Sequence, residues 1–370
     1  MRWISPRSWV SIIPLIAMAS ACRPDLASMT ASVVSSPKAP ATSVPMPHPS
    51  PIDRDHDPVA INRACEGCHP AIAQEWRDSL HAQAHTDPAY QRALAIEPLP
   101  FCRSCHAPEA DHLSDPPAPL GELGVGCVTC HVTEDNHILA TPNLKNTISK
   151  TPHPVFRAAD FATASACAHC HEFPFPGSRS GRPRELMQST ISEHRKGSYA
   201  NVSCASCHMP TARDAQGHGH RSHRFVSSRD AAFIRSAVNV RALRTASGLD
   251  IHLDPQAVGH AFPTGDLFRR VEVLLEVVGA EEQVLFQDRR MLTRRFDIVQ
   301  LPDGNRTKVL SEDTRVHGPT VLSFPIDAAL ANFPVRYSVT YQRVEHPVGA
   351  SDENAVVEGE VLVAGGEIVP

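Results

Sequence analysis

The pattern of apolar and polar residues changes near residue 230. Beyond Arg229, Val, Leu and Ile alternate with polar residues in short runs, separated by breaks such as Pro302-Asp303-Gly304. Alternation with a period of two predicts β-strands that bury one face. The predicted strands are residues 237–244, 249–253, 270–278, 283–288, 321–324, 335–343 and 355–363. This series of short strands indicates an all-β antiparallel sandwich over residues 231–370.

Residues 61–230 show a different pattern. Apolar residues recur at helical spacing in residues 70–81 and 184–196, and frequent Pro and Gly residues interrupt the rest. We therefore expect short helices joined by loops. Such a region has no continuous side-chain core, so its stability must have another source.

Five C-x-x-C-H motifs in this region suggest that source. Two thiols three positions apart can add to the two vinyl groups of one porphyrin, while the next histidine binds the iron. Zinc or a redox disulfide would account for a single C-x-x-C pair. Neither explains why a histidine follows the second cysteine in all five motifs. We predict five covalently bound haem c groups. The predicted attachment residues are Cys65, Cys68, Cys102, Cys105, Cys127, Cys130, Cys167, Cys170, Cys204 and Cys207, with His69, His106, His131, His171 and His208 as proximal iron ligands.

The spacing of the motifs predicts that the haems pack against one another. Consecutive motifs begin 37, 25, 40 and 37 residues apart, which is too short for separate domains. The chain is therefore expected to be multidomain, with a mainly α and irregular pentahaem cytochrome domain at residues 61–230 and the β-sandwich after it. Closely packed haems provide short steps for electrons, which favours an electron carrier.

The N-terminus has the features of a secretory signal peptide over residues 1–21. Arg2 and Arg7 precede an apolar stretch at residues 9–18 and a run of small residues at 19–21. This stretch is too short to span a bilayer as a mature helix. Export agrees with the haem motifs, because c-type haem is attached on the outer side of the energy-transducing membrane.

Cys22, the cysteine outside the motifs, allows two interpretations. Cleavage after Ala21 would leave a soluble periplasmic protein with a free thiol. Alternatively, the sequence resembles a bacterial lipoprotein, in which the cysteine after the cleavage site carries the lipid, and we favour this interpretation. Residues 22–60 are rich in Pro, Ser and Ala, as expected of a tether. The protein is thus expected to be periplasmic or anchored to the outer membrane.

The charge of the chain bears on its partners. Removing Arg2 and Arg7 with the signal peptide changes the formal net charge from −5 to −7, and each haem adds propionate carboxylates. An acidic holoprotein argues against binding to nucleic acid and favours redox partner proteins with basic docking surfaces.

Five segments resemble the cytochrome c-554 family of multihaem electron carriers, and the resemblance covers residues 61 to about 200. They are CEGCHPAIAQEWRDSLHAQA at 65–84, FCRSCH at 101–106, GVGCVTCH at 124–131, CAHCH at 167–171 and EHRK at 193–196. It implies that His81 is the distal ligand of the third haem, His137 of the first and His194 of the fourth. In the family the second haem lacks a distal protein ligand. His85 and His112 lie near the second motif here, and either could close that site.

The fifth motif adds to the four-haem pattern. CASCHMP at 204–210, followed by HGHRSHRF at 218–225, resembles the last motif of other multihaem cytochromes. This resemblance favours His223 or His220 as the distal ligand, with His218 third. GHAFPTGD at 259–266 resembles an element of β domains attached to such cytochromes. His260 either binds a haem iron across the domain boundary or fixes a turn.

Three functions agree with this sequence. The first is a periplasmic multihaem c-type cytochrome that relays electrons. The second is a multihaem oxidoreductase that acts on a small nitrogen or sulfur compound at an open-site haem, although the sequence has no C-x-x-C-K motif. The third concerns the β domain, which would dock the cytochrome to a partner complex and is compatible with the first.

Overall fold

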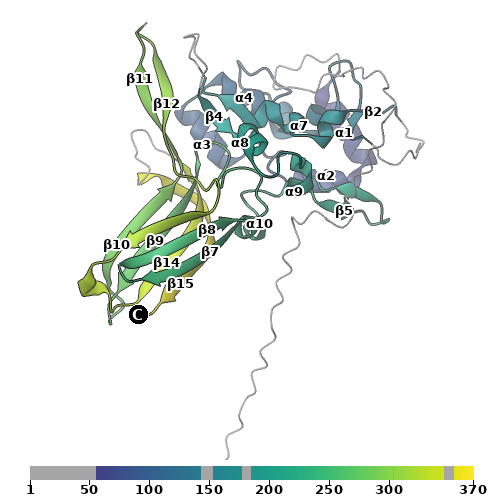
Figure 1. Ribbon diagram of the computed structural model, residues 1–370. Helices are drawn as coiled ribbons and strands as arrows, with labels where there is room; N and C mark the ends of the chain where they lie inside the picture. The colour runs from purple at the N-terminus through teal and green to yellow at the C-terminus, as the bar shows by residue number, and fades with distance from the viewer. Residues whose placement is uncertain (1–55, 143–152, 177–184, 303, 346–353) are drawn as a thin grey trace, which may run out of the picture.

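The computed structural model describes residues 56–142, 153–176, 185–302, 304–345 and 354–370 (Figure 1). The predicted signal peptide, Cys22 and most of the predicted tether lie outside these residues. The labelled helices α1–α4 and α7–α9 gather in the upper part of Figure 1, and strands β7–β10, β14 and β15 form a second region at the lower left. The change from one to the other falls at α10 (Ala231–Ser236), which leads into β7 (Val238–Thr245).

The helices of the first region are short. Proline at the first helical position and side-chain caps explain where several begin: Asp57 accepts from Val59 N at 2.9 Å, and Asp87 from Ala89 N at 3.1 Å. The helices are α1 (Pro58–Cys68), α2 (Pro70–Arg77), α3 (Pro88–Ile96), α4 (Pro100–His106), α5 (Ala118–Leu123), α6 (Cys127–His131), α7 (Ser165–His171), α8 (Thr190–Lys196) and α9 (Cys204–His208).

Three two-stranded pairs and a 3₁₀ turn complete this region. They are β1 (Leu139–Ala140) with β2 (Phe156–Arg157), β3 (Glu172–Pro174) with β4 (Leu186–Ser189), β5 (Thr211–Arg213) with β6 (Gly219–Arg221), and the turn at Ala159–Ala162. The helix predicted at residues 184–196 is therefore only partly correct, because β4 occupies its first half. β4 pairs with β3, and that backbone partner outweighs the local helical pattern.

The side-chain core of the first region is small, as expected. Trp76, Leu123, Val128 and Val132 form one buried cluster, and Leu139 packs on Ala158 in another. The Trp76 indole donates to Val125 O at 2.8 Å, which fixes the segment before the third motif on α2. α2 ends at Arg77, short of the predicted residue 81, and turns carry the chain on past His81.

The second region is antiparallel, as the alternation predicted. One sheet has the order β10-β9-β14-β15, another β13-β8-β7, and β11 pairs with β12 alone. The further strands are β8 (Gly248–Pro255), β9 (Arg269–Val278), β10 (Val284–Leu292), β11 (Arg294–Gln300), β12 (Arg306–Asp313), β13 (Thr320–Pro325), β14 (Val335–Glu345) and β15 (Val356–Ile368). Each predicted strand overlaps one of these.

One apolar core draws side chains from both larger sheets. Alternate residues of β9, Val271, Val273, Leu275 and Val277, are at most 1% exposed, and they share this core with Ile251 of β8. Packing of the two sheets as a sandwich stays a prediction. The β11–β12 hairpin was not predicted, and it projects beside α3 and β4 in Figure 1. Its Ile298 side chain is 62% exposed, so the apolar residues of this hairpin do not mark one buried face.

Ion pairs and hydrogen bonds join the two regions. Glu193 of α8 pairs with Arg315 at 2.8 Å, and both side chains are less than 10% exposed. Arg92 of α3 pairs with Glu345 at 3.0 Å and also with Glu358. Arg294 donates to the carbonyl of Leu186 at 3.0 Å, which ties the hairpin to β4. Among the helices that the structure describes, none is both long and apolar enough to cross a membrane.

Candidate functional site

All five motifs line one cavity of about 3280 Å³ between the helices and the β region. Its lining includes all ten motif cysteines and all five motif histidines. Protein interiors are close-packed and hold few voids larger than a water molecule. A cavity of this size, lined by thiols in pairs with one histidine each, fits several large flat groups held covalently. The donor set therefore suits haem c.

Each motif lies on a short helix that ends at or just before its histidine. The cysteines at the first and fourth positions of a motif are three residues apart, so they project from the same face of the helix. α4, α6, α7 and α9 end at His106, His131, His171 and His208, and His69 is the C-cap of α1. The helix thus brings two thiols and an imidazole to one edge of the cavity.

Backbone carbonyls fix the orientation of three motif histidines. Nδ1 of His106 donates to Ala84 O at 2.6 Å, and Nδ1 of His131 donates to Leu139 O at 2.8 Å. Nδ1 of His208 donates to Val226 O at 2.7 Å. Because a carbonyl only accepts, each Nδ1 carries the proton and Nε2 keeps its lone pair for a metal.

Burial lowers the pKa of two histidines that face each other in the cavity, His81 and His171. It lowers the pKa of His171 to about 4, with a further contribution from His208 and other neighbouring imidazoles. Burial and the proximity of His171 also lower the pKa of His81 to about 3. Only the neutral imidazole binds iron, so at neutral pH these side chains are ready to act as ligands.

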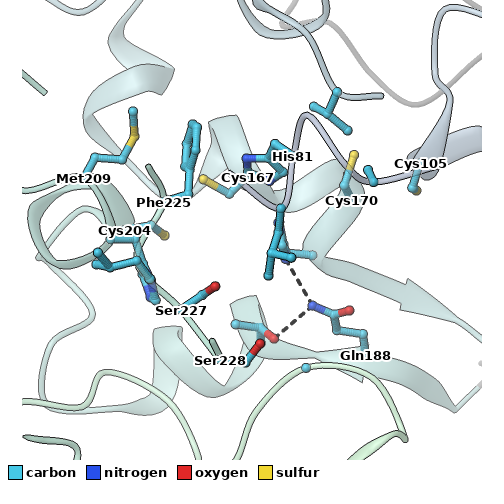
Figure 2. Close-up of a pocket in the computed structure, with 18 of the residues that line it drawn as sticks. His81, Cys105, Cys167, Cys170, Gln188, Cys204, Met209, Phe225, Ser227 and Ser228 are labelled. Atoms are coloured by element: carbon cyan, nitrogen blue, oxygen red, sulfur yellow. Dashed lines mark hydrogen bonds between the residues drawn. The ribbon is translucent and has the colours of Figure 1, made fainter. Parts of the chain in front are cut away.

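Three motif histidines each face a second histidine across the cavity. The ring centres are 6.2 Å apart for His171 and His81, 6.1 Å for His131 and His223, and 6.2 Å for His208 and His260. In Figure 2 the His81 side chain lies near the thiols of Cys167 and Cys170, which belong to the motif of His171.

The structure thus groups the histidines differently from the resemblance. It brings His81 to the fourth motif rather than the third, since the ring centres of His81 and His171 are 6.2 Å apart. It brings His223 to the third motif, not the fifth, and His260 to the fifth. Nε2 of His220 instead pairs with Glu75 at 3.2 Å.

The remaining predicted histidines are divided between the cavity and its surroundings. His194 lines the cavity and is buried, and among the described residues its Nδ1 has no hydrogen-bond partner. His137 lies outside the lining, with its ring centre 4.4 Å from that of Phe156. His85, His112 and His218 are also outside the lining, and His218 pairs with Asp214 at 3.0 Å.

Three cavity residues were missed by the sequence reasoning. His56 and His153 line the cavity, but neither lies in a motif that could have indicated it. The ring of Tyr90 stacks on His106 with centres 3.8 Å apart and planes 9° apart. Burial raises the pKa of Tyr90, and its hydroxyl has no hydrogen-bond partner in the described part of the chain. The position of Tyr90 in the sequence, relative to the second motif, did not indicate this contact.

Thiols of different motifs lie close together. Cys105 is hydrogen-bonded to Cys170, and Cys167 to Cys204, so the fourth motif touches both the second and the fifth. Cys130 interacts electrostatically with Cys167 and Cys170, which places the third motif next to the fourth. The first motif is the most peripheral, because Cys68 is exposed whereas the other motif cysteines are partly buried.

Comparisons with known proteins agree with the haem motifs. The family described as "Cytochrome c554 and c-prime" matches residues 64–132, which include the first three motifs. This segment is thus similar to the multihaem c-type cytochromes of that family. The chain is also similar to a solved structure, described as a penta-heme cytochrome c552 from Thermochromatium tepidum, with 19% identity and a TM-score of 0.61. The alignment covers 87% of this chain and 100% of that chain.

At this identity the likeness establishes the fold, and it extends over both the helical and the β region of the chain. A search of curated proteins found no match. The family supports covalently bound haem c and a role in electron transfer.

Proposed function

We propose that the protein is an exported pentahaem cytochrome that relays electrons through haems packed in one cavity. The observation that carries this proposal is the contact between thiols of different motifs within a single cavity. Porphyrins attached to such neighbouring thiols lie close to one another, so electrons cross short distances. The count of five rests on the five motifs and on the penta-heme relative.

The contacts between motifs suggest the order of the relay. With haems numbered by the order of their motifs, haem 1 neighbours haem 3, since Cys65 interacts electrostatically with Cys127. Haem 3 neighbours haem 4, which in turn touches haems 2 and 5. The path would therefore branch at haem 4, and the exposed first motif makes haem 1 the accessible end.

Ring spacing supports three bis-histidine haems. A bond from a histidine nitrogen to a metal is about 2 Å, so two imidazoles that held one iron between them would have ring centres about 6 Å apart. The separations of 6.1–6.2 Å match this value. We assign His223 to haem 3, His81 to haem 4 and His260 to haem 5.

A second candidate function rests on haem 2. Neither His85 nor His112 lines the cavity, whereas the Tyr90 ring lies against His106. This arrangement favours an open distal position on haem 2, where a small nitrogen or sulfur compound could bind. The sequence resemblance points the same way.

The location and partners are part of the proposal. The features of residues 1–22 support export and a lipid on Cys22, and the acidic charge supports redox partners with basic docking surfaces. Cys22→Ser should move the protein from the membrane fraction to the soluble periplasmic fraction. A wild type that is already soluble with an unmodified N-terminus would favour simple cleavage.

Two measurements test the relay. Intact-mass analysis of protein exported with the haem-attachment machinery should show the mass of five haems, and three or fewer would overturn the count. The EPR spectrum of the oxidised protein should contain low-spin signals from at least haems 3, 4 and 5. A high-spin signal, with carbon monoxide binding after reduction, would support the second candidate. Five low-spin haems that bind no ligand would exclude it.

A further inference from the structure

Two arginines lie side by side where the β region faces the haem cavity. Arg269 of β9 and Arg343 of β14 are direct cross-strand partners, and both line the cavity. Like charges directly opposite each other on antiparallel strands are destabilising. This pair therefore calls for compensating negative charge.

A third arginine adds to the positive charge. Arg229, just before α10, lines the same cavity. Burial lowers the pKa of Arg343, and the charges of Arg269 and Arg229 lower it further. The three guanidinium groups thus lie close enough to repel one another.

Two carboxylates offset only part of this charge. Asp87 accepts a hydrogen bond from Arg229, and Asp266 lies 3.5 Å from Arg269. Arg343 donates from Nη1 to the neutral carbonyl of Ser228 at 3.0 Å. Among the described residues, none provides a carboxylate within ion-pair distance of Arg343.

The neighbouring strand leaves room for Arg343. Gly359 of β15 is its cross-strand partner on the other side, and a Cβ at position 359 would overlap Nη2 of Arg343. Glycine at this position lets the guanidinium lie across the strand at the cavity wall. The site is therefore built from three elements: a pair of opposed arginines, a third from the adjoining loop, and the space that Gly359 provides.

We propose that Arg229, Arg269 and Arg343 form a binding site for oxyanions, with carboxylate as the preferred group, at the boundary between the haem cavity and the β region. The planar guanidinium offers paired donors that match the two oxygens of a carboxylate. The ligand has two sources: a haem propionate, which rests on the proposed function, or a small oxyanion that enters from solution. In either case the β region contributes directly to the haem site.

Arg343→Gln in the haem-loaded protein tests this site. If the ligand is a propionate, the midpoint potential of one haem should fall, because a nearby cation favours the reduced haem. Arg343→Lys should retain part of the effect, and Gly359→Ala should lower the same potential by displacing the guanidinium. Arg241→Gln is the matched control: Arg241 pairs with Asp254 at 2.8 Å and does not line the cavity. The haem midpoint potentials of this control variant should equal those of the wild type.

A calorimetric titration with nitrite or acetate distinguishes the second source. A site for a free oxyanion should show saturable binding to the wild type, and Arg343→Gln should weaken it about tenfold while leaving the haem potentials unchanged. Unchanged potentials together with no binding that depends on Arg343 would overturn the proposal. The intact mass of each variant reports separately on haem attachment, so a failure of the proposed function would be recognised as such.

Discussion

The helical region and the β region differ in how much apolar side-chain core stabilises each of them. Among the described residues, the larger core of the helical region has four buried apolar side chains, whereas the core of the β region has eighteen. The β region buries enough apolar surface to fold around its own side chains. The helical region surrounds a cavity of about 3280 Å³, so it depends on what fills that cavity. One chain thus combines a side-chain core with a cofactor core.

Removing a haem should have the largest effect and test the contrast directly. Cys127→Ala with Cys130→Ala deletes both attachment points of haem 3, next to the buried Val128. We expect the helical region to lose at least about 5 kcal/mol of unfolding free energy, because cofactor binding contributes to folding. Limited proteolysis should cut this region while residues 231–370 stay resistant. Arg241→Gln, outside the cavity lining, is the control and should keep the wild-type pattern.

A cavity in the β core should destabilise the β region and leave the haems unchanged. Leu275→Ala removes a side chain that is 0% exposed, and we expect a loss of about 3–4 kcal/mol in urea unfolding of the β region. Leu243→Ala, at a side chain that is 49% exposed, should change stability by less than about 1 kcal/mol. The haem spectrum should be unchanged in both. A changed haem spectrum in Leu275→Ala would mean that the two cores are not independent.

The buried ion pair between the regions should couple them. Glu193 accepts from Thr264 Oγ1 at 2.6 Å and from Ala261 N at 3.2 Å, on the segment that bears His260, and pairs with Arg315. Glu193→Ala should cost about 3 kcal/mol, since it leaves Arg315 with fewer partners. One haem should also become partly high-spin in EPR. Stability loss with a wild-type EPR spectrum would show that Glu193 does not position His260.

The pH dependence of the β region should reflect Asp313. Burial alone would raise the pKa of Asp313, but hydrogen bonds from Arg315 and His317 hold it well below the ordinary value. A carboxylate with a lowered folded pKa stabilises the protein above the ordinary pKa of about 4, and this contribution is lost as the pH falls toward the folded pKa. Asp313→Asn should therefore cost about 1–2 kcal/mol at pH 7 and progressively less in acid. Equal differences at pH 7 and pH 3 in urea unfolding would contradict this.

The surface ion pairs of Arg92 should have the smallest effect. Arg92 joins α3 to Glu345 and Glu358, and its side chain is 46% exposed. We expect Arg92→Gln to cost less than about 1 kcal/mol, decreasing further in high salt. A larger loss of stability in thermal unfolding would show that the exposed ion pairs of Arg92 hold the two regions together as strongly as the buried Glu193 does.

Features that depend on residues close together in the sequence could be predicted, and features that depend on distant residues could not. The strands were found because residues such as those of β9 alternate between a buried and an exposed face. The thiols and proximal histidines could be predicted because one helical turn contains the whole motif. The facing histidines could not be paired from the sequence, because His81 and His171 are 90 residues apart and only the folded chain brings them together. The β11–β12 hairpin was missed because its exposed faces leave no alternation.

The contacts between thiols of different motifs have a consequence for biosynthesis. Cys105 with Cys170, and Cys167 with Cys204, join motifs that are far apart in the chain. If an exported chain folded before its haems were attached, these thiols would meet in an oxidising compartment, where disulfides form. Such crosslinks would close two attachment sites at once. For an exported chain, we therefore expect haem attachment to precede folding.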